Sequence, residues 1–206
     1  DTDGDGIPDC VSGDTDEDGI GDACDECPQA SNLNGAGCPA TIYQVKQEGL
    51  VGSSIAITAQ VTAIQDEQRG FFIQISPEQD IYQGVDYSAM YVYFNNAPMT
   101  VSFPAVGDWI EVSGTAGEFY GQIQLSMITA LTILSSDNSD IPHTLSTASD
   151  ANNPAFEGCL ISVENVTVTA VNLEPGPGDQ APTEEFLVND ALVINNLFYK
   201  LVYFLI

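Results

Sequence analysis

The sequence predicts a mainly β protein, with a coreless acidic segment, then a small closed or nearly closed β-barrel, then an additional β region. The first observation is that residues 1–28 hold eleven of the 30 acidic residues and no Lys or Arg. The second is that Val, Ile, Tyr, Phe and Thr recur in short, Gly-punctuated runs from Thr41 onward, which is typical of strands. The third is that no long stretch repeats with helical period.

The length of 206 residues suits one large domain or two small ones. Composition places the boundaries at 1–28 for the acidic segment, 29–40 for a small polar linker and 41–138 for the barrel. Residues 139–206 are the additional β region, which either completes the barrel or forms a partial second one. The chain begins at Asp1 without Met or a signal peptide, so we interpret it as a mature or excised fragment.

The acidic segment contains the same loop pattern twice, thirteen residues apart. Alternate Asp side chains on a tight turn converge on one point, Gly permits the turn, and the following Ile offers its carbonyl. Ca²⁺ takes six to eight oxygens in this flexible way. The loops read Asp1-x-Asp3-x-Asp5-Gly6-Ile7-x-Asp9 and Asp14-x-Asp16-x-Asp18-Gly19-Ile20-x-Asp22.

These loops begin like EF-hand loops and then depart from them. An EF-hand ends on a bidentate Glu at position twelve, where this chain has Ser12 and Asp25. No amphipathic helix flanks either loop. A helix–loop–helix calcium sensor is therefore excluded.

Electrostatics also favours a metal over the alternative of a disordered acidic linker. Two carboxylates about 4 Å apart repel by about 4 kcal/mol at an effective dielectric near 20. Several such pairs would unfold a coreless segment, so cation binding should drive its folding. Random acidic tails also lack Gly at fixed offsets and nearby cysteines.

With its closing Asp25-Glu26-Cys27-Pro28, residues 1–28 resemble the thrombospondin type 3 repeat. The resemblance implies a segment that wraps around calcium and is stapled by disulfides, here Cys10–Cys24 and Cys27–Cys38. It also implies the ligand candidates, which are Asp1, Asp3, Asp5, Asp9, Asp14, Asp16, Asp18, Asp22 and Asp25, with carbonyls from Ile7 and Ile20.

Four of the five cysteines lie within the first 38 residues, which indicates disulfides and an oxidising compartment. A zinc site at Cys24-x-x-Cys27 is the weaker interpretation, because zinc needs four converging Cys or His ligands. The single histidine, His143, is far away in the sequence.

Five strand runs follow in order in the barrel region. In the first, Ile55, Ile57, Ala59, Val61 and Ala63 fall on one face. Five closely spaced strands favour a small barrel. The runs are "GSSIAITAQVTAIQ", "GFFIQIS", "YSAMYVYFNN", "VGDWIEVSGTAGEF" and "YGQIQLSMITALTIL".

This region resembles the OB-like barrels of secreted bacterial nucleases and related surface proteins. The resemblance is carried by "TIYQVKQEG", "GFFIQIS", "VGDWIEVSGTAGEFYGQIQL" and, further on, "FEGCLISVENVTVTAV". In that fold, exposed aromatics and basic residues stack and hold single strands. The aromatic candidates here are Phe71, Phe72, Tyr91, Tyr93 and Tyr120, although aromatics in strands mostly fill cores or pair across strands.

Residues 139–153 read as a polar passage with a possible short helix. The strand pattern restarts in "FEGCLISVENVTVTAV", and a Pro/Gly loop leads into the β-prone final run of residues 186–206. The closing "LFYKLVYFLI" is apolar, yet too short and too interrupted by Lys200 for a membrane span.

The net charge of −27, with only Lys46, Arg69 and Lys200 positive, makes nucleic acid an improbable partner. It favours cations instead. Catalysis has little support. His143 has no nucleophile motif beside it, and the nuclease catalytic signature is absent from the chain. Cys159 lies in the strand-like run "FEGCLIS", which favours a buried thiol over a nucleophile. An intermolecular disulfide is the alternative.

The sequence therefore predicts a non-catalytic calcium-binding structural protein, secreted or at the cell surface. We expect a surface, matrix or filament subunit that assembles through β-strand contacts, with "LFYKLVYFLI" adding to a neighbouring sheet edge. The partners are then calcium ions and further copies or another extracellular protein. The alternative is a nucleic-acid- or glycan-binding accessory module of a larger secreted nuclease or adhesin.

Overall fold

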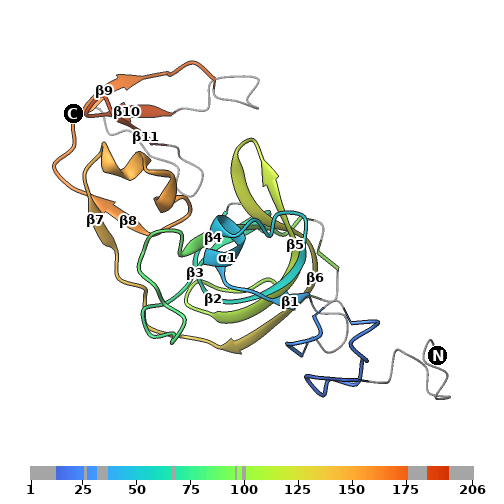
Figure 1. Cartoon of the computed structure of the whole chain (residues 1–206). Helices are drawn as coiled ribbons and strands as arrows, with labels where there is room; N and C mark the ends of the chain where they lie inside the picture. Colours follow the sequence, from blue (N-terminus) through green and yellow to red (C-terminus); the bar gives the residue numbers. More distant parts are fainter. Residues whose placement is uncertain are drawn as a thin grey trace.

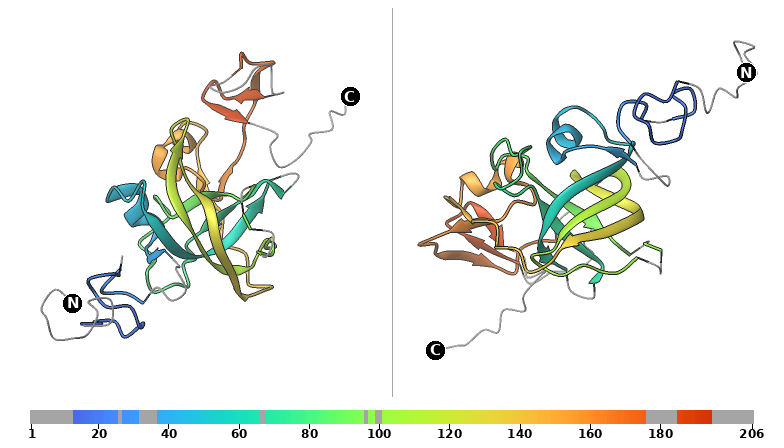
Figure 2. Two further views of the ribbon diagram at one scale, coloured as in Figure 1. Left: turned by 90° about the vertical axis from the view of Figure 1, so that its right-hand side faces the viewer. Right: turned by 90° about the horizontal axis from the view of Figure 1, so that it is seen from below.

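The structure is a computed structural model, and it describes residues 13–25, 27–31, 37–65, 68–95, 97–98, 101–175 and 185–194. Figure 1 shows a body of curved strands with a short helix against it, and the acidic segment and the C-terminal strands on opposite sides of this body. The views of Figure 2 agree on that arrangement. The predicted fold class, mainly β, is confirmed.

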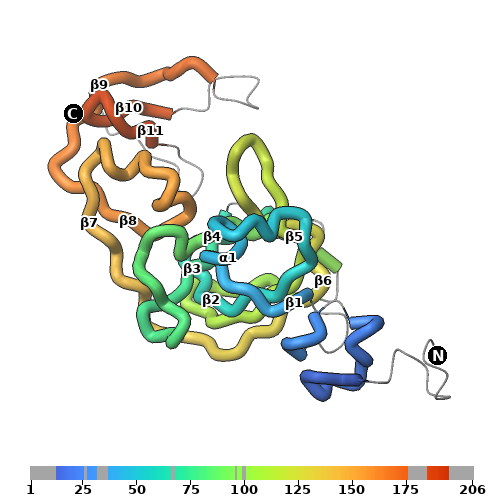
Figure 3. The backbone as a smooth tube through the Cα atoms, in the orientation of Figure 1, coloured from blue at the N-terminus to red at the C-terminus, as the bar shows by residue number. Residues whose placement is uncertain are grey.

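One six-stranded sheet forms the body. Its order is β1-β2-β3-β4-β6-β5, and β2 pairs with β5 as well. Pairing therefore runs from β2 through β3, β4, β6 and β5 and returns to β2, a path that the tube of Figure 3 follows. The strands are β1 (Cys38–Pro39), β2 (Ser54–Ile64), β3 (Gly70–Gln74), β4 (Ala89–Tyr93), β5 (Trp109–Phe119) and β6 (Gln122–Ser135).

The five long strands occupy the five predicted runs. The β1–β2 and β4–β6 pairs are parallel, and the other pairs of this sheet are antiparallel. In β2, Ile55, Ile57, Ala59 and Val61 are buried as predicted, whereas Ala63 is only half-buried. Alternation along β2 therefore aims one face into the core.

The core lies inside this circuit of strands. Fully burying an aliphatic or aromatic side chain contributes roughly 1.5–3 kcal/mol, so the cluster dominates the stability of the body. Its largest fully buried side chains are Phe71, Ile42, Ile55, Ile57, Ile73, Ile75, Met90, Ile110, Leu125, Val45, Val61 and Val92.

The expectation that strands dominate from Thr41 onward is wrong for the next residues, which form the helix α1 (Ile42–Gln47). Thr41 is its N-cap. The Gln44 backbone N–H donates to Thr41 Oγ1 at 3.2 Å, and the Thr41 N–H donates to Gln44 Oε1 at 2.9 Å. This capping box satisfies two N–H groups that a helix start leaves unpaired. Ile42, Tyr43 and Val45 then face the core.

The end of the predicted linker belongs to the sheet. Cys38 and Pro39 pair in parallel with Ile55 and Ala56 of β2. Gly37, just before β1, packs against the backbone of Ile55, and a Cβ at this position would lie 2.2 Å from the Ile55 backbone nitrogen. Only glycine permits this approach.

The additional β region forms two sheets of its own. Among the described residues, its strands pair only with one another, so they do not complete the six-stranded sheet. β7 (Thr144–Ser146) pairs in parallel with β8 (Ile161–Val163), and β10 (Phe186–Val188) lies between β9 (Val168–Val171) and β11 (Leu192–Ile194). Two short 3₁₀ helices, Asp150–Asn152 and Pro154–Phe156, separate β7 from β8.

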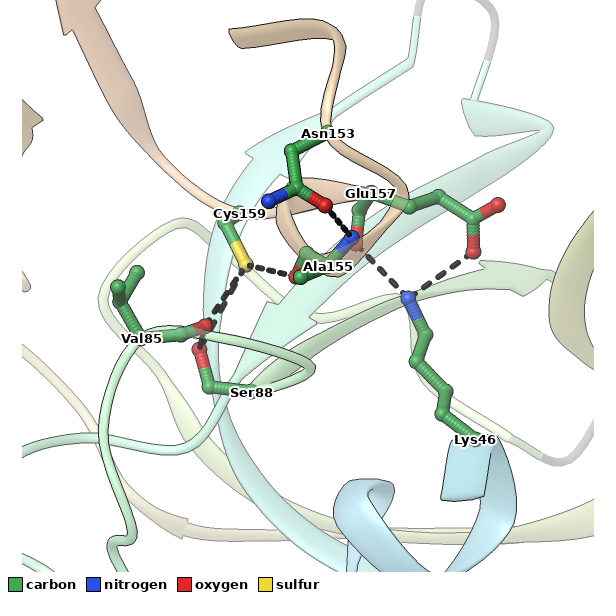
Figure 4. A network of polar contacts seen from close by, with 7 residues as sticks. All are labelled: Lys46, Val85, Ser88, Asn153, Ala155, Glu157 and Cys159. Carbon is green, nitrogen blue, oxygen red and sulfur yellow. Dashed lines mark hydrogen bonds and ion pairs between the residues drawn. The ribbon is translucent and has the colours of Figure 1, made fainter. Parts of the chain in front are cut away.

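A polar network attaches residues 153–160 to the body (Figure 4). Lys46 Nζ donates to the Glu157 carbonyl at 2.8 Å and pairs with the Glu157 carboxylate at 2.9 Å. The Cys159 thiol donates to the Val85 carbonyl at 3.2 Å, with Ser88 Oγ 3.6 Å away. Because the Lys46 side chain is only 3% exposed, removal of Glu157 would leave a buried ammonium group without its ion-pair partner.

No helix in the described part of the chain has both the length and the apolar character that crossing a membrane requires.

Candidate metal-binding loop and aromatic groove

The second acidic loop brings three of the predicted ligands together. Carboxylate oxygens of Asp14, Asp16 and Asp18 all lie within 4.8 Å of one another, and each residue is half-buried. Hydrogen bonds from backbone N–H groups to the Asp14 carboxylate hold the turn of this loop. Asp14 accepts hydrogen bonds from the backbone N–H groups of Asp18 at 3.2 Å and Gly19 at 2.9 Å. Gly19 has φ +95°, as predicted for the turn.

Two buried carboxylate oxygens have no hydrogen-bond partner among the described residues: Asp16 Oδ2, in the cluster, and Asp25 Oδ2. Desolvation, followed by repulsion from Asp18 and Asp25, raises the pKa of Asp16 above its ordinary value. An orphaned, buried carboxylate oxygen among other carboxylates is costly. A bound cation would remove that cost, and the hard oxygen donors suit Ca²⁺.

The remaining predicted ligands have different surroundings. The Asp22 carboxylate accepts from the Thr15 N–H at 2.9 Å and from Thr15 Oγ1 at 2.7 Å. These hydrogen bonds lower the pKa of Asp22 and hold its carboxylate against Thr15. Ile20 donates its N–H to Asp18 Oδ1 at 2.9 Å. Five predicted ligands of the first loop lie outside the described residues, namely Asp1, Asp3, Asp5, Ile7 and Asp9.

Disulfides flank the acidic loop, as expected. Cys27 and Cys38 are bonded, with Cα atoms 5.4 Å apart, which confirms the second predicted bridge. Cys24 is disulfide-bonded too. Its expected partner, Cys10, lies outside the described residues. The Cys27–Cys38 bridge joins the acidic segment to β1 and through it to β2.

A groove on the outer face of the sheet is the second candidate site. It has a volume of about 440 Å³. Four aromatic side chains and four amides line it together with one arginine. They are Phe72, Tyr91, Tyr93 and Phe119, then Gln65, Asn95, Gln122 and Gln124, and Arg69.

Strand alternation explains why aromatics line this groove. Phe71 and Ile73 of β3 face the core, so Phe72 between them faces outward. In the same way, Tyr91 and Tyr93 of β4 flank the buried Val92. Tyr91 is 9% exposed, and Phe72 and Tyr93 are half-buried, so these rings lie between the core and the solvent.

Sheet register places three of these side chains in one row. Tyr91 pairs with Phe72 on one side and with Gln124 on the other. The Phe72 and Tyr91 rings have centroids 5.0 Å apart and are tilted by 52°. Gly117 continues the row opposite Gln124 and adds no side chain. The row therefore forms an open trough with an aromatic wall.

Tyr91 is held firmly at the base of the trough. Its hydroxyl donates to Gln65 Oε1, and desolvation raises its pKa to about 12. Gly70 makes room for it, since a Cβ at Gly70 would lie 2.2 Å from the Tyr91 hydroxyl oxygen. Asn95 Nδ2 donates to the Tyr93 hydroxyl at 3.3 Å. The polar ends of both tyrosines are thereby fixed.

The β5–β6 hairpin supplies the rim of the groove. Phe119 pairs with Gln122 across the two-residue turn Tyr120–Gly121, in which both residues have positive φ. This suits a type I′ turn, whose twist matches that of the strands. Phe119 is 59% exposed and lines the groove, whereas Tyr120 at the tip does not.

Of the aromatic residues that the sequence offered for stacking, some line the groove and others do not. Phe71 is fully buried against Phe94 and Phe103 and cannot stack on a ligand, which agrees with the core interpretation. Phe72, Tyr91 and Tyr93 line the groove. Phe119 was missed, although its place beside the Tyr120–Gly121 turn is a signal for a rim position.

The surroundings of His143 and Cys159 do not support a catalytic role for either residue. His143 is exposed in the polar passage before β7. Cys159 is a free, half-buried thiol, and desolvation is the first cause of its raised pKa. A thiol of this kind is a poor nucleophile at neutral pH.

Comparison with known proteins leaves the family open. No family model matches the chain, and no curated protein matches it. One similar solved structure is a Leishmania major Friedlin protein assigned as an aspartyl-tRNA synthetase, with 15% identity and a TM-score of 0.35 over 61% of this chain. The chain spans about a quarter (26%) of that protein. Another is OBody AM1L10 bound to hen egg-white lysozyme, with 14% identity and a TM-score of 0.29 over 42% of this chain and 83% of that one.

Proposed function

We propose that this protein is a non-catalytic structural protein of the extracellular space or cell surface whose acidic segment folds around calcium. The observation that carries the proposal is the cluster of Asp14, Asp16 and Asp18, with partnerless oxygens on Asp16 and Asp25. The disulfide between Cys27 and Cys38 supports an oxidising compartment.

In the second loop, Asp14, Asp16, Asp18 and Asp25 would hold the ion, with the Ile20 carbonyl and Asp22 as further candidates. The ion would supply charge neutralisation, which the chain itself lacks because residues 1–28 contain no cation. The first loop, with its own candidates from Asp1 to Asp9, would bind in the same way. Calcium binding and ordering of the segment would then be one process.

The body would be an OB-like barrel that serves as the rigid mount for this segment. Support comes from five strands, β2, β3, β4, β6 and β5, paired in a circuit with a parallel β4–β6 contact. Self-assembly is the remaining part of the proposal. Its expected element, "LFYKLVYFLI", lies outside the described residues, so it rests on the sequence alone.

Calorimetric titration of the chelator-treated protein with Ca²⁺ tests the calcium site. We expect Asp16→Asn to weaken the site at the second loop at least tenfold, because it removes a charge from the centre of the cluster. Asp140→Asn, an exposed acid outside the segment, serves as the matched control and should leave the affinity unchanged. A wild-type protein that binds no Ca²⁺ contradicts the proposal.

Light scattering after size separation, with and without calcium, tests assembly separately. We expect species larger than a monomer in calcium. A protein that is monomeric under both conditions would remove the filament or matrix role and leave the calcium site untouched.

A second candidate function is a ligand-binding module, and the aromatic groove favours it. The groove is made by described residues of β3, β4, β5 and β6 and the loops beside them. It is independent of the acidic segment, none of whose described residues line it.

A further inference from the structure

We propose that the groove of Phe72, Tyr91, Tyr93 and Phe119 binds a neutral oligosaccharide. The inference rests on the second candidate function and names its ligand class. The volume of about 440 Å³ falls in the range of roughly 300–1,000 Å³ that small-molecule sites occupy.

The aromatic side chains supply surfaces that fit sugar rings. A pyranose presents faces of C–H bonds that are slightly positive, whereas an aromatic face is negative. Phe119, at the rim, has the most exposed ring of the four. Phe72 and Tyr91 are tilted by 52° and so form a trough rather than one flat platform.

The polar lining matches hydroxyl groups. A sugar hydroxyl donates one hydrogen bond and accepts two, and an amide side chain offers both donors and acceptors. Gln122 and Gln124 lie on β6, and both line the groove beside the aromatic side chains. Arg69, just before β3, also lines the groove.

Charge separates this ligand from single-stranded nucleic acid, which also stacks on aromatics. Binding a phosphate chain needs several cations to replace its counterions. Arg69 is the one cation among the described lining residues, and the whole chain carries a net charge of −27. No described lining residue is a carboxylate, so an uncharged ligand meets no repulsion there.

Calorimetry or ligand-observed NMR on the full chain tests the inference. The probes are xylohexaose, cellohexaose, mannohexaose and chitohexaose, with a twelve-nucleotide oligothymidylate as the charged competitor. We expect at least one hexasaccharide to bind with a dissociation constant below 1 mM (~−4 kcal/mol). We expect no binding of the oligonucleotide at 150 mM salt.

Two matched pairs of variants locate the site. Phe119→Ala should weaken saccharide binding at least tenfold, whereas Val106→Ala, at an exposed apolar position that does not line the groove, should change it less than twofold. Gln124→Met keeps the side-chain volume and removes the hydrogen bonds, so it should weaken binding about fivefold. Gln47→Met, at an exposed position of α1, is the control with the same substitution. Circular dichroism of each variant verifies folding.

Chelation distinguishes this inference from the calcium proposal. Saccharide binding should persist in EDTA, because no described residue of the acidic segment lines the groove. The inference is overturned if none of the four hexasaccharides binds. It is also overturned if the oligonucleotide binds more tightly than they do, or if Phe119→Ala leaves saccharide affinity unchanged.

Discussion

At the residue scale, Cys159 shows how surroundings set reactivity. The thiol donates to the Val85 carbonyl and is half-buried beside Ser88 (Figure 4), and its pKa is raised chiefly by desolvation. The folded state thus holds the thiol proton more tightly than the unfolded state does. The stabilisation is fully present below the ordinary thiol pKa and is lost as pH rises from there through the raised pKa of the folded state.

We therefore expect the native protein to react with iodoacetamide more slowly than the guanidinium-unfolded protein, with its rate midpoint at higher pH. The measurement is the labelling rate of Cys159 between pH 7 and 10, followed by mass spectrometry. The Cys159→Ser variant is the control for labelling at other sites. A native midpoint at or below the unfolded one would contradict the assigned environment.

Single residues also show how far the sequence can predict a site. The spacing of Asp14, Asp16 and Asp18 was sufficient, because a local turn determines where their carboxylates meet. The orientation of Asp22 toward Thr15 depends on hydrogen bonds that no spacing rule contains. The groove was harder still, since Phe72 and Gln124 become neighbours only through the pairing of β3, β4 and β6.

At the scale of elements, β-prone runs punctuated by glycine identified β2 to β6, and alternation of buried residues was visible in β2. The helix α1 was missed because six residues are too few to show a period. Its capping box, Thr41 with Gln44, was the available signal. β1, with two residues, has no pattern of its own and exists through its pairing with β2.

Two glycines beside strands of this sheet should differ in how much an alanine substitution destabilises the protein. Gly37→Ala should destabilise the protein by at least about 2 kcal/mol, because its Cβ would collide with the Ile55 backbone. Gly121→Ala, with φ +87° and open space around it, should cost only about 1 kcal/mol of backbone strain. Urea unfolding of both variants measures the difference. Equal losses of unfolding free energy in the two variants would contradict the close packing of Gly37 against Ile55.

At the scale of the whole molecule, the acidic segment and the β body should respond to calcium independently. The body has an apolar core, whereas the described part of the acidic segment contributes only Cys27 to the buried hydrophobic residues. We expect EDTA to expose residues 13–25 to proteases within minutes and to leave the thermal transition of the body within about 2 °C. Proteolysis with mass spectrometry and calorimetry measure both. A body that melts together with the segment would show that calcium supports the entire fold.

The bridge between Cys27 and Cys38 has a mechanical consequence. Tension applied to the chain ahead of Cys27 would pass through the sulfur atoms directly into β1 at Cys38 and would bypass the chain between the two cysteines. Because β1 runs parallel to β2, such a load would act along the strands and strain their hydrogen bonds together rather than one after another. The joint would therefore resist tension applied to the chain ahead of Cys27.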